Sequence, residues 1–152
     1  MFKRFLVLAI FFFSMGKIMS QTPEDSVKLT INQFMNAIGN SNGISIIACF
    51  ADSNSTYQTI FKNRNGGLEV KNENIREFAH IIGSQPLNSI SQKFSFDVVK
   101  TDGPLAAVWT SYKFYANGKV HHCGICSFQL VRLGNQWKIQ YLIDTRHTDR
   151  CE

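Results

Sequence analysis

The sequence lacks any hydrophobic run long enough to cross a bilayer as a helix. Its longest unbroken apolar stretch is residues 5–13, nine residues, whereas a spanning helix needs about 20. This stretch follows the basic residues Lys3 and Arg4 and precedes the small residue Ser20, which is the layout of a secretory signal peptide. We therefore predict a cleaved signal peptide over residues 1–20, export to the periplasm or out of the cell, and no permanent membrane anchor.

Clustered positive charge is also scarce. The full chain carries 16 Lys and Arg against 11 Asp and Glu, a formal net charge of +5. Cleavage after residue 20 removes three basic residues and leaves 13 against 11, a net charge of +2, with no two of the remaining basic residues adjacent. A protein that tracks nucleic-acid phosphates needs clustered cations. We therefore predict no nucleic-acid partner.

No internal repeat, low-complexity segment or linker interrupts the rest of the chain. The hydrophobic content, 44% for the whole sequence, is ordinary for a globular protein and excludes disorder. A chain of this size buries about two-thirds of the surface that its unfolded form exposes. Residues 21–152 are therefore predicted to form a single domain.

Helices are predicted in the first half of this domain. Thr22 is a cap-type residue and Pro23 suits the first helical position, so a helix is expected over 23–39. Apolar residues at helical spacing predict two more helices, at about 44–50 and 74–82.

Strands dominate the second half, where the apolar period changes from about 3.6 to 2. One earlier strand is expected near 57–61, followed by a polar turn. Short connections make consecutive strands antiparallel neighbours, and Asn117-Gly118 is a strong hairpin signal. We predict an α+β fold whose antiparallel sheet contains the segments 91–100, 105–116, 120–133 and 136–145.

The run His121-His-Cys-Gly-Ile-Cys126 contains a Cys-x-x-Cys spacing that fits neither a redox motif nor a zinc motif. A redox motif begins a helix, whereas Cys126 leads into an alternating strand. Two Cys three residues apart on a strand face opposite ways and do not converge on one metal ion. A c-type haem attachment needs His where Ser127 stands. We predict no metal site and no cofactor.

Strand parity predicts which side chains face the interior of the sheet. Successive side chains on a strand point to opposite faces, so inward Phe128 and Leu130 place His122 and Cys126 on the same inner face. His122 is the inward candidate that titrates near neutral pH, which makes it the candidate general base. The alternative is a hydrogen-bonded structural histidine.

Aromatic residues with polar tips are the other candidates for a ligand-binding site: Tyr57, Trp109, Tyr112 and Tyr141. Such side chains combine a large apolar area with one hydrogen-bonding group. The alternative is that they only fill the core.

Asp144 and Arg146 are predicted to lie away from this interior. Parity sets them opposite Trp137 and Ile139 on the last strand. We expect them to form an ion pair on the outer face of the sheet, where such a pair contributes little to stability.

A series of short motifs runs through the predicted strands: Leu105-Ala-Ala-Val-Trp109, Tyr112-Lys-Phe114, Gly118, His122-Cys-Gly124, Phe128-Gln-Leu130, Trp137-Lys-Ile139 and Asp144-Thr-Arg146. This series resembles the exported bacterial SnoaL-like members of the nuclear transport factor 2-like (NTF2-like) superfamily. The resemblance extends over nearly all of residues 21–152.

The resemblance implies a cone, in which a strongly bent antiparallel sheet wraps around two or three N-terminal helices and encloses a pocket. It also implies frequent pairing of two copies through the sheet, so we expect a homodimer, with Asp144 and Arg146 near its rim. It does not imply one reaction, because the superfamily includes isomerases, dehydratases, cyclases, epoxide hydrolases and proteins that only bind.

A disulfide pairing is implied by the same resemblance. Similar chains with the His-Cys-Gly motif end in a second Cys just past Asp-Thr-Arg, and here that residue is Cys151. A bond from Cys123 to Cys151 would tie the C-terminal tail to the sheet in a compartment where disulfides persist. Cys49 is then expected as a buried thiol in an apolar helix, and Cys126 as a thiol facing the pocket.

Three functions remain open at this point. The first is an exported protein that binds a small apolar or aromatic ligand in the cone. The second is an isomerase or dehydratase that uses His122 as its base, and the third is a dimeric interaction module with a filled core. The sequence shows no acidic partner for His122 on the inner face, which favours binding over catalysis.

Overall fold

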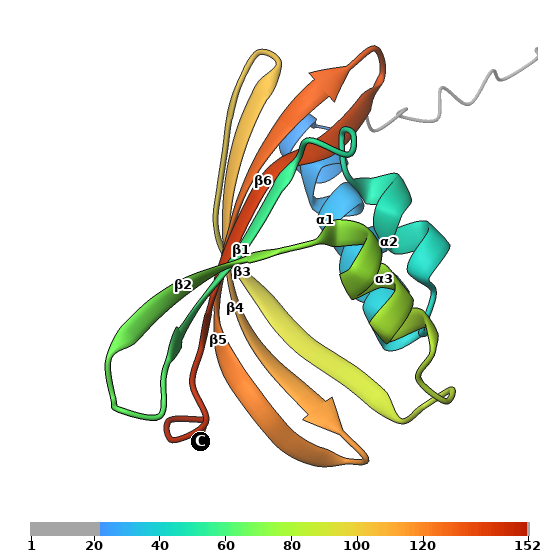
Figure 1. The fold of residues 1–152 in the computed structure, drawn as a ribbon. Coiled ribbons are helices and arrows are strands. Elements are labelled where there is room, and N and C mark those ends of the chain that lie inside the picture. The colour runs from blue at the N-terminus through green and yellow to red at the C-terminus, as the bar shows by residue number, and fades with distance from the viewer. Residues whose placement is uncertain (1–21, 152) are drawn as a thin grey trace, which may run out of the picture.

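The computed structural model describes residues 22–151, so the predicted signal peptide lies outside the described residues. The described residues form three helices and six strands, and the helices lie together on one side of a strongly bent sheet (Figure 1), which confirms the predicted α+β class. The elements in chain order are α1 (Pro23–Gly39), α2 (Gly43–Cys49), β1 (Thr56–Lys62), β2 (Leu68–Glu73), α3 (Ile75–Gly83), β3 (Ile90–Asp102), β4 (Leu105–Ala116), β5 (Lys119–Leu133) and β6 (Gln136–Arg146).

Helix α1 begins where the sequence predicts it. The Thr22 hydroxyl accepts a hydrogen bond from the Asp25 N–H at 3.1 Å, and the Asp25 carboxylate accepts one from the Thr22 N–H at 3.2 Å. This reciprocal capping box satisfies two backbone donors at the start of the helix. The buried face of α1 includes Val27, Ile31 and Phe34, and the Phe34 ring lies edge-on to Phe128 of β5 at 6.0 Å. That contact joins the helix to the sheet.

The second and third helices are also present, each within one residue of its predicted bounds. Asn42 and Asn74 cap them by accepting hydrogen bonds from backbone N–H groups in the first turns. Gly43 packs directly against the Ala79 carbonyl oxygen, and a side chain at position 43 would collide with it. The two helices therefore approach each other closely through a glycine.

The sheet has the strand order β2-β1-β6-β5-β4-β3. All neighbouring strands are antiparallel except β1 and β6, which pair in parallel, so the sheet is mixed. Strand β2 was not predicted. Leu68 and Val70 alternate with Glu69 and Lys71 in the sequence, but nearly all of its residues are solvent-exposed, so this alternation marks no buried face.

Three register shifts bend the long strands. They leave Asp97 of β3, His121 of β5 and Gln140 of β6 without a cross-strand partner. The shift at Gln140 determines the site, because it reverses the facing of every later residue on β6. As a result Asp144 is buried on the inner face, and the prediction that Asp144 and Arg146 lie on the outer face is wrong.

The chain end is fixed to β5 by a disulfide between Cys123 and Cys151, whose Cα atoms are 5.5 Å apart. This confirms the pairing implied by the resemblance. His147 adds two backbone hydrogen bonds to Cys123, of 2.8 and 3.0 Å. Cys49 and Cys126 are free and buried. None of the helices within residues 22–151 is long and apolar enough to cross a membrane.

Candidate functional site

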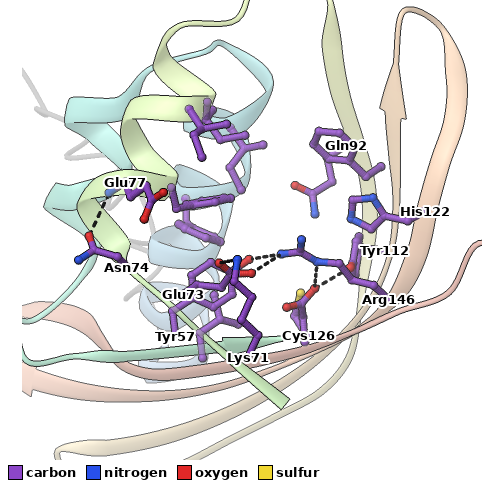
Figure 2. A pocket seen from close by; sticks show the side chains of 18 residues that line it. Tyr57, Lys71, Glu73, Asn74, Glu77, Gln92, Tyr112, His122, Cys126 and Arg146 are labelled. Carbon is purple, nitrogen blue, oxygen red and sulfur yellow. Dashed lines mark hydrogen bonds and ion pairs between the residues drawn. The ribbon is translucent and has the colours of Figure 1, made fainter. Parts of the chain in front are cut away.

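A cavity of about 300 Å³ lies between the helices and the inner face of the sheet, at the lower end of the size of ligand pockets. Its apolar lining comes from the helices and the sheet: Phe34, Ile38, Phe78, Ile81, Ile82, Phe114 and Leu142. Its polar lining, labelled in part in Figure 2, consists of Tyr57, Lys71, Glu73, Asn74, Glu77, Gln92, Tyr112, His122, Cys126, Asp144 and Arg146.

Asp144 is the buried centre of the polar end, with only 4% of the residue exposed. Its Oδ1 accepts a hydrogen bond from the Thr59 hydroxyl at 2.7 Å. Its Oδ2 accepts from the Tyr112 hydroxyl at 2.8 Å and from Arg146 Nε at 3.0 Å. Burial of a carboxylate is costly unless it is paired and hydrogen-bonded. Donors from three different strands therefore offset that cost and fix the position of the group.

Arg146 extends from the end of β6 into the cavity (Figure 2). Its Nη2 donates to the Tyr57 hydroxyl at 2.9 Å and lies 4.0 Å from Glu73 Oε1. Burial alone would lower the pKa of Arg146, but Tyr57 and Asp144 outweigh burial and raise it. The guanidinium is therefore a permanent cation, held between Asp144 on one side and Tyr57 on the other.

Strand β2 contributes a second ion pair at the cavity. Lys71 Nζ donates to Glu73 Oε2 at 2.9 Å. Glu73 thus lies between Lys71 and Arg146, and only 16% of its side chain is exposed. The alternating charges form a short network in which each acid has a basic neighbour.

His122 lines the cavity from β5 and stacks on Phe114, with ring centroids 4.9 Å apart and 20° between the planes. Its Nδ1 lies 2.8 Å from Nδ1 of His121. Burial, and then the positive charge of Arg146, lower the pKa of His122 to about 4. The imidazole is therefore neutral at pH 7 and is a weak base.

Four of the six predicted site residues are brought together in this cavity: Tyr57, Tyr112, Cys126 and His122. Burial, and then Asp144, raise the pKa values of Tyr57 and Tyr112 above the usual range, so both hydroxyls keep their protons. The same two causes raise the pKa of the Cys126 thiol, which makes it a poor nucleophile.

Trp109 and Tyr141 do not line the cavity, and their predicted inward placement is wrong. Trp109 lies three residues from Tyr112 on β4, so it points to the opposite face and is 48% exposed. Tyr141 follows the register shift at Gln140, and its hydroxyl donates to Gln58 Oε1 at 2.8 Å instead of entering the cavity.

Seven polar residues of the cavity lining are not among the residues predicted from the sequence: Lys71, Glu73, Asn74, Glu77, Gln92, Asp144 and Arg146. Asp144 and Arg146 were assigned to the wrong face, because a register shift leaves no clear mark in the sequence. Glu73 belongs to the unpredicted strand β2. Gln92 lies on β3, and the alternation of that strand with Phe94 and Phe96 would have placed it on the inner face.

No metal centre is formed by the described residues, since no three His, Cys, Asp or Glu side chains within 22–151 are grouped to hold an ion. The polar end is instead built from hydrogen-bond donors and paired charges. Such an arrangement can orient the polar part of a ligand, while the aromatic walls contact its apolar part.

Comparisons with known proteins give matches in structure only. No protein-family model and no curated protein matches the sequence. An NTF2-like protein of unknown function from Shewanella baltica OS155 superposes with a TM-score of 0.65 at 12% identity, covering 82% of this chain and 93% of that one. A domain of unknown function with a cystatin-like fold from Nostoc punctiforme gives a TM-score of 0.64 at 15% identity, covering 86% and 82% of the two chains.

A third neighbour agrees with these two. An NTF2-like protein of unknown function from Methylobacillus flagellatus superposes with a TM-score of 0.60 at 18% identity, covering 82% of this chain and 91% of that one. Identities this low establish a shared architecture and nothing about activity. The resemblance seen in the sequence is thus confirmed for the architecture, and the chain has the NTF2-like α+β cone fold.

Proposed function

We propose that this protein binds a small molecule with an apolar body in the cavity between the helices and the sheet. The observation that carries the proposal is the contrast between the two parts of the lining. Apolar atoms, including those of the Tyr57 and Tyr112 rings, form most of the wall, and the Asp144–Arg146 pair forms a fixed polar end. Ligand pockets commonly combine an apolar lining with a few well-placed polar groups.

Binding is favoured over proton-transfer catalysis by the surroundings of His122. An efficient general base needs a pKa near the working pH, and a hydrogen-bonded carboxylate raises the pKa of an imidazole. The polar contact of the His122 side chain within the described residues is with His121, and its pKa is lowered to about 4. The presence of the cavity disfavours the alternative of an interaction module, because that alternative assumes a filled core.

The test is a titration of the protein with naphthalene, in which binding is measured from the NMR chemical shifts of the protein. Ile81 lines the cavity and is 51% exposed, so Ile81→Trp should block the cavity with little disturbance of the core. We expect naphthalene to bind, and Ile81→Trp to weaken binding at least tenfold. Ile44→Trp is the matched control, because Ile44 is 85% exposed and lies outside this cavity. Absence of binding, or equal binding by both variants, would overturn the proposal.

Export and dimerisation are proposed alongside binding. The disulfide fits an oxidising compartment. Trp109 and Val98 face each other across β4 and β3 and are 48% and 46% exposed on the outer face of the sheet. An exposed apolar patch of this kind supports pairing of two copies there. Sedimentation equilibrium should give a dimer for the unaltered chain and a monomer for Trp109→Lys; a monomeric unaltered chain would contradict this.

A further inference from the structure

We propose that the ligand of this cavity has an uncharged polar head that both accepts and donates a hydrogen bond, as a carboxamide does, and that Gln92 accepts the hydrogen bond that the head donates. This inference rests on the proposed function and names the class of ligand. Four observations on the cavity lining carry it.

The first observation is the balance of charge. Arg146 is paired with Asp144 at 3.0 Å, and Lys71 with Glu73 at 2.9 Å. Both cations that line the cavity therefore already have an anion, and Glu77 adds one further acid to the lining. A carboxylate ligand would enter a site with more negative than positive groups, and its loss of hydration would not be offset.

The second observation is that both oxygens of the buried Asp144 carboxylate already accept hydrogen bonds. Thr59, Tyr112 and Arg146 all donate to its two oxygens, and the residue is 4% exposed. An ammonium group of a ligand would have to compete with these donors for a buried carboxylate. The Asp144 end of the cavity therefore favours neither a positively nor a negatively charged head.

The third observation is a hydroxyl group in the cavity lining that can still donate a hydrogen bond. The Tyr57 hydroxyl accepts from Arg146 Nη2 at 2.9 Å, and no residue within 22–151 accepts the Tyr57 proton. Burial, and then Asp144, raise the pKa of Tyr57, so the proton stays on the hydroxyl. Tyr57 can therefore donate a hydrogen bond to a carbonyl oxygen of the ligand.

The fourth observation is an acceptor with no donor. Gln92 Oε1 is buried, and no group in the described part of the chain donates to it. Gln92 pairs with Phe114 across β3 and β4, and Phe114 pairs with His122 across β4 and β5, so Gln92 and His122 line the same wall of the cavity. A buried carbonyl oxygen without a donor is unfavourable by itself, and an N–H or O–H of a bound ligand would satisfy it. The ligand head must then carry a donor in addition to the acceptor that Tyr57 requires.

The experiment compares four probes on the full chain with its disulfide intact, at pH 7: naphthalene, methyl 2-naphthoate, 2-naphthoate and 2-naphthamide. We expect 2-naphthamide to bind about tenfold more tightly than either the ester or the carboxylate. The ester lacks a hydrogen-bond donor, and the loss of one hydrogen bond to a buried group predicts a difference of this size. Gln92→Met keeps the length of the side chain and should bring the amide to the affinity of the ester.

The control is Gln136→Met, an exposed position at the start of β6, which should leave all four affinities unchanged. Melting temperatures of both variants check that the fold is retained. Three outcomes would overturn the inference and leave the proposed function standing. Naphthalene could bind while the amide binds no more tightly than the ester, the carboxylate could bind more tightly than the amide, or the preference for the amide could persist in Gln92→Met. Failure of all four probes to bind would overturn the proposed function and this inference together.

Discussion

Asp144 and Arg146 lie two residues apart on β6 and meet inside the cavity, where Arg146 Nε donates to the Asp144 carboxylate at 3.0 Å. Their inward placement depends on one residue. Gln129 pairs with Tyr141 and Leu130 pairs with Ile139, so Gln140 has no partner across the strands. One unpaired residue reverses the facing of the rest of the strand, and this reversal turns a surface pair into the polar end of a pocket.

The energetic coupling of this pair is the first prediction. Arg146→Met leaves the buried carboxylate without its cation and should lower the free energy of unfolding by about 3 kcal/mol. This is the low end of the range for a buried pair, and we expect it because the Arg146 side chain is 31% exposed. Asp144→Asn should also destabilise the protein. The double variant should lose less stability than the sum of the two single losses, by about 1 kcal/mol or more. Urea unfolding of the four proteins measures this, and additive losses would show that the pair is not coupled.

The sequence predicted the helices well because their signals are local. Thr22 and Asn74 are cap residues, and apolar residues at helical spacing follow them. The inner face of β5 was also predicted correctly, since Cys126, Phe128 and Leu130 alternate without interruption.

The remaining errors come from non-local features. The parallel pairing of β1 with β6 brings together segments that are about 80 residues apart, and no local pattern records it. The shift at Gln140 is set by how β6 fits β5 in the bent sheet. Trp109 is different, because it lies three residues from Tyr112 on β4 and strand parity alone predicts that it faces outward.

The second prediction concerns Gly124 on β5. A Cβ atom at this position would collide with the Thr145 carbonyl oxygen, which belongs to backbone. Gly124→Ala should therefore move β5 and β6 apart and lower the free energy of unfolding by about 2 kcal/mol or more. Gly39→Ala is the matched control, because a Cβ atom there meets nothing within 4 Å. Equal stability of the two variants in urea would refute the steric explanation.

Processing of the chain is the third prediction. The apolar run at 5–13 and the small residue Ser20 predict that an exported form begins at or near Gln21. N-terminal sequencing of protein recovered outside the cytoplasm checks this. Recovery of intact Met1 in that fraction would count against a cleaved signal peptide.

The disulfide gives the fourth prediction. Closing a 28-residue separation between Cys123 and Cys151 should stabilise the protein by roughly 3 to 4 kcal/mol in the chain-entropy account. Reduction should lower the melting temperature, Cys151→Ser should reproduce that loss, and reduction of the variant should then add little. Cys49→Ser is the control, because Cys49 is free. Peptide mapping without reductant that found Cys123 joined to Cys126 would refute the pairing.

The fifth prediction is a pH dependence of stability that originates at His122. Burial, and then Arg146, lower its pKa in the folded protein to about 4, from an ordinary value of 6.5. Between these two values the unfolded chain binds more protons than the folded one, so the contribution of His122 to stability is complete above about pH 6.5 and is lost as the pH falls towards 4.

His122→Gln cannot be protonated and should lose less stability over this pH window than the unaltered protein. His80→Gln, on the exposed side of α3, is the matched control and should behave like the unaltered protein. Urea unfolding at pH 7, 5.5 and 4.5 measures the difference, and equal pH profiles for the unaltered protein and His122→Gln would show that His122 does not carry this dependence.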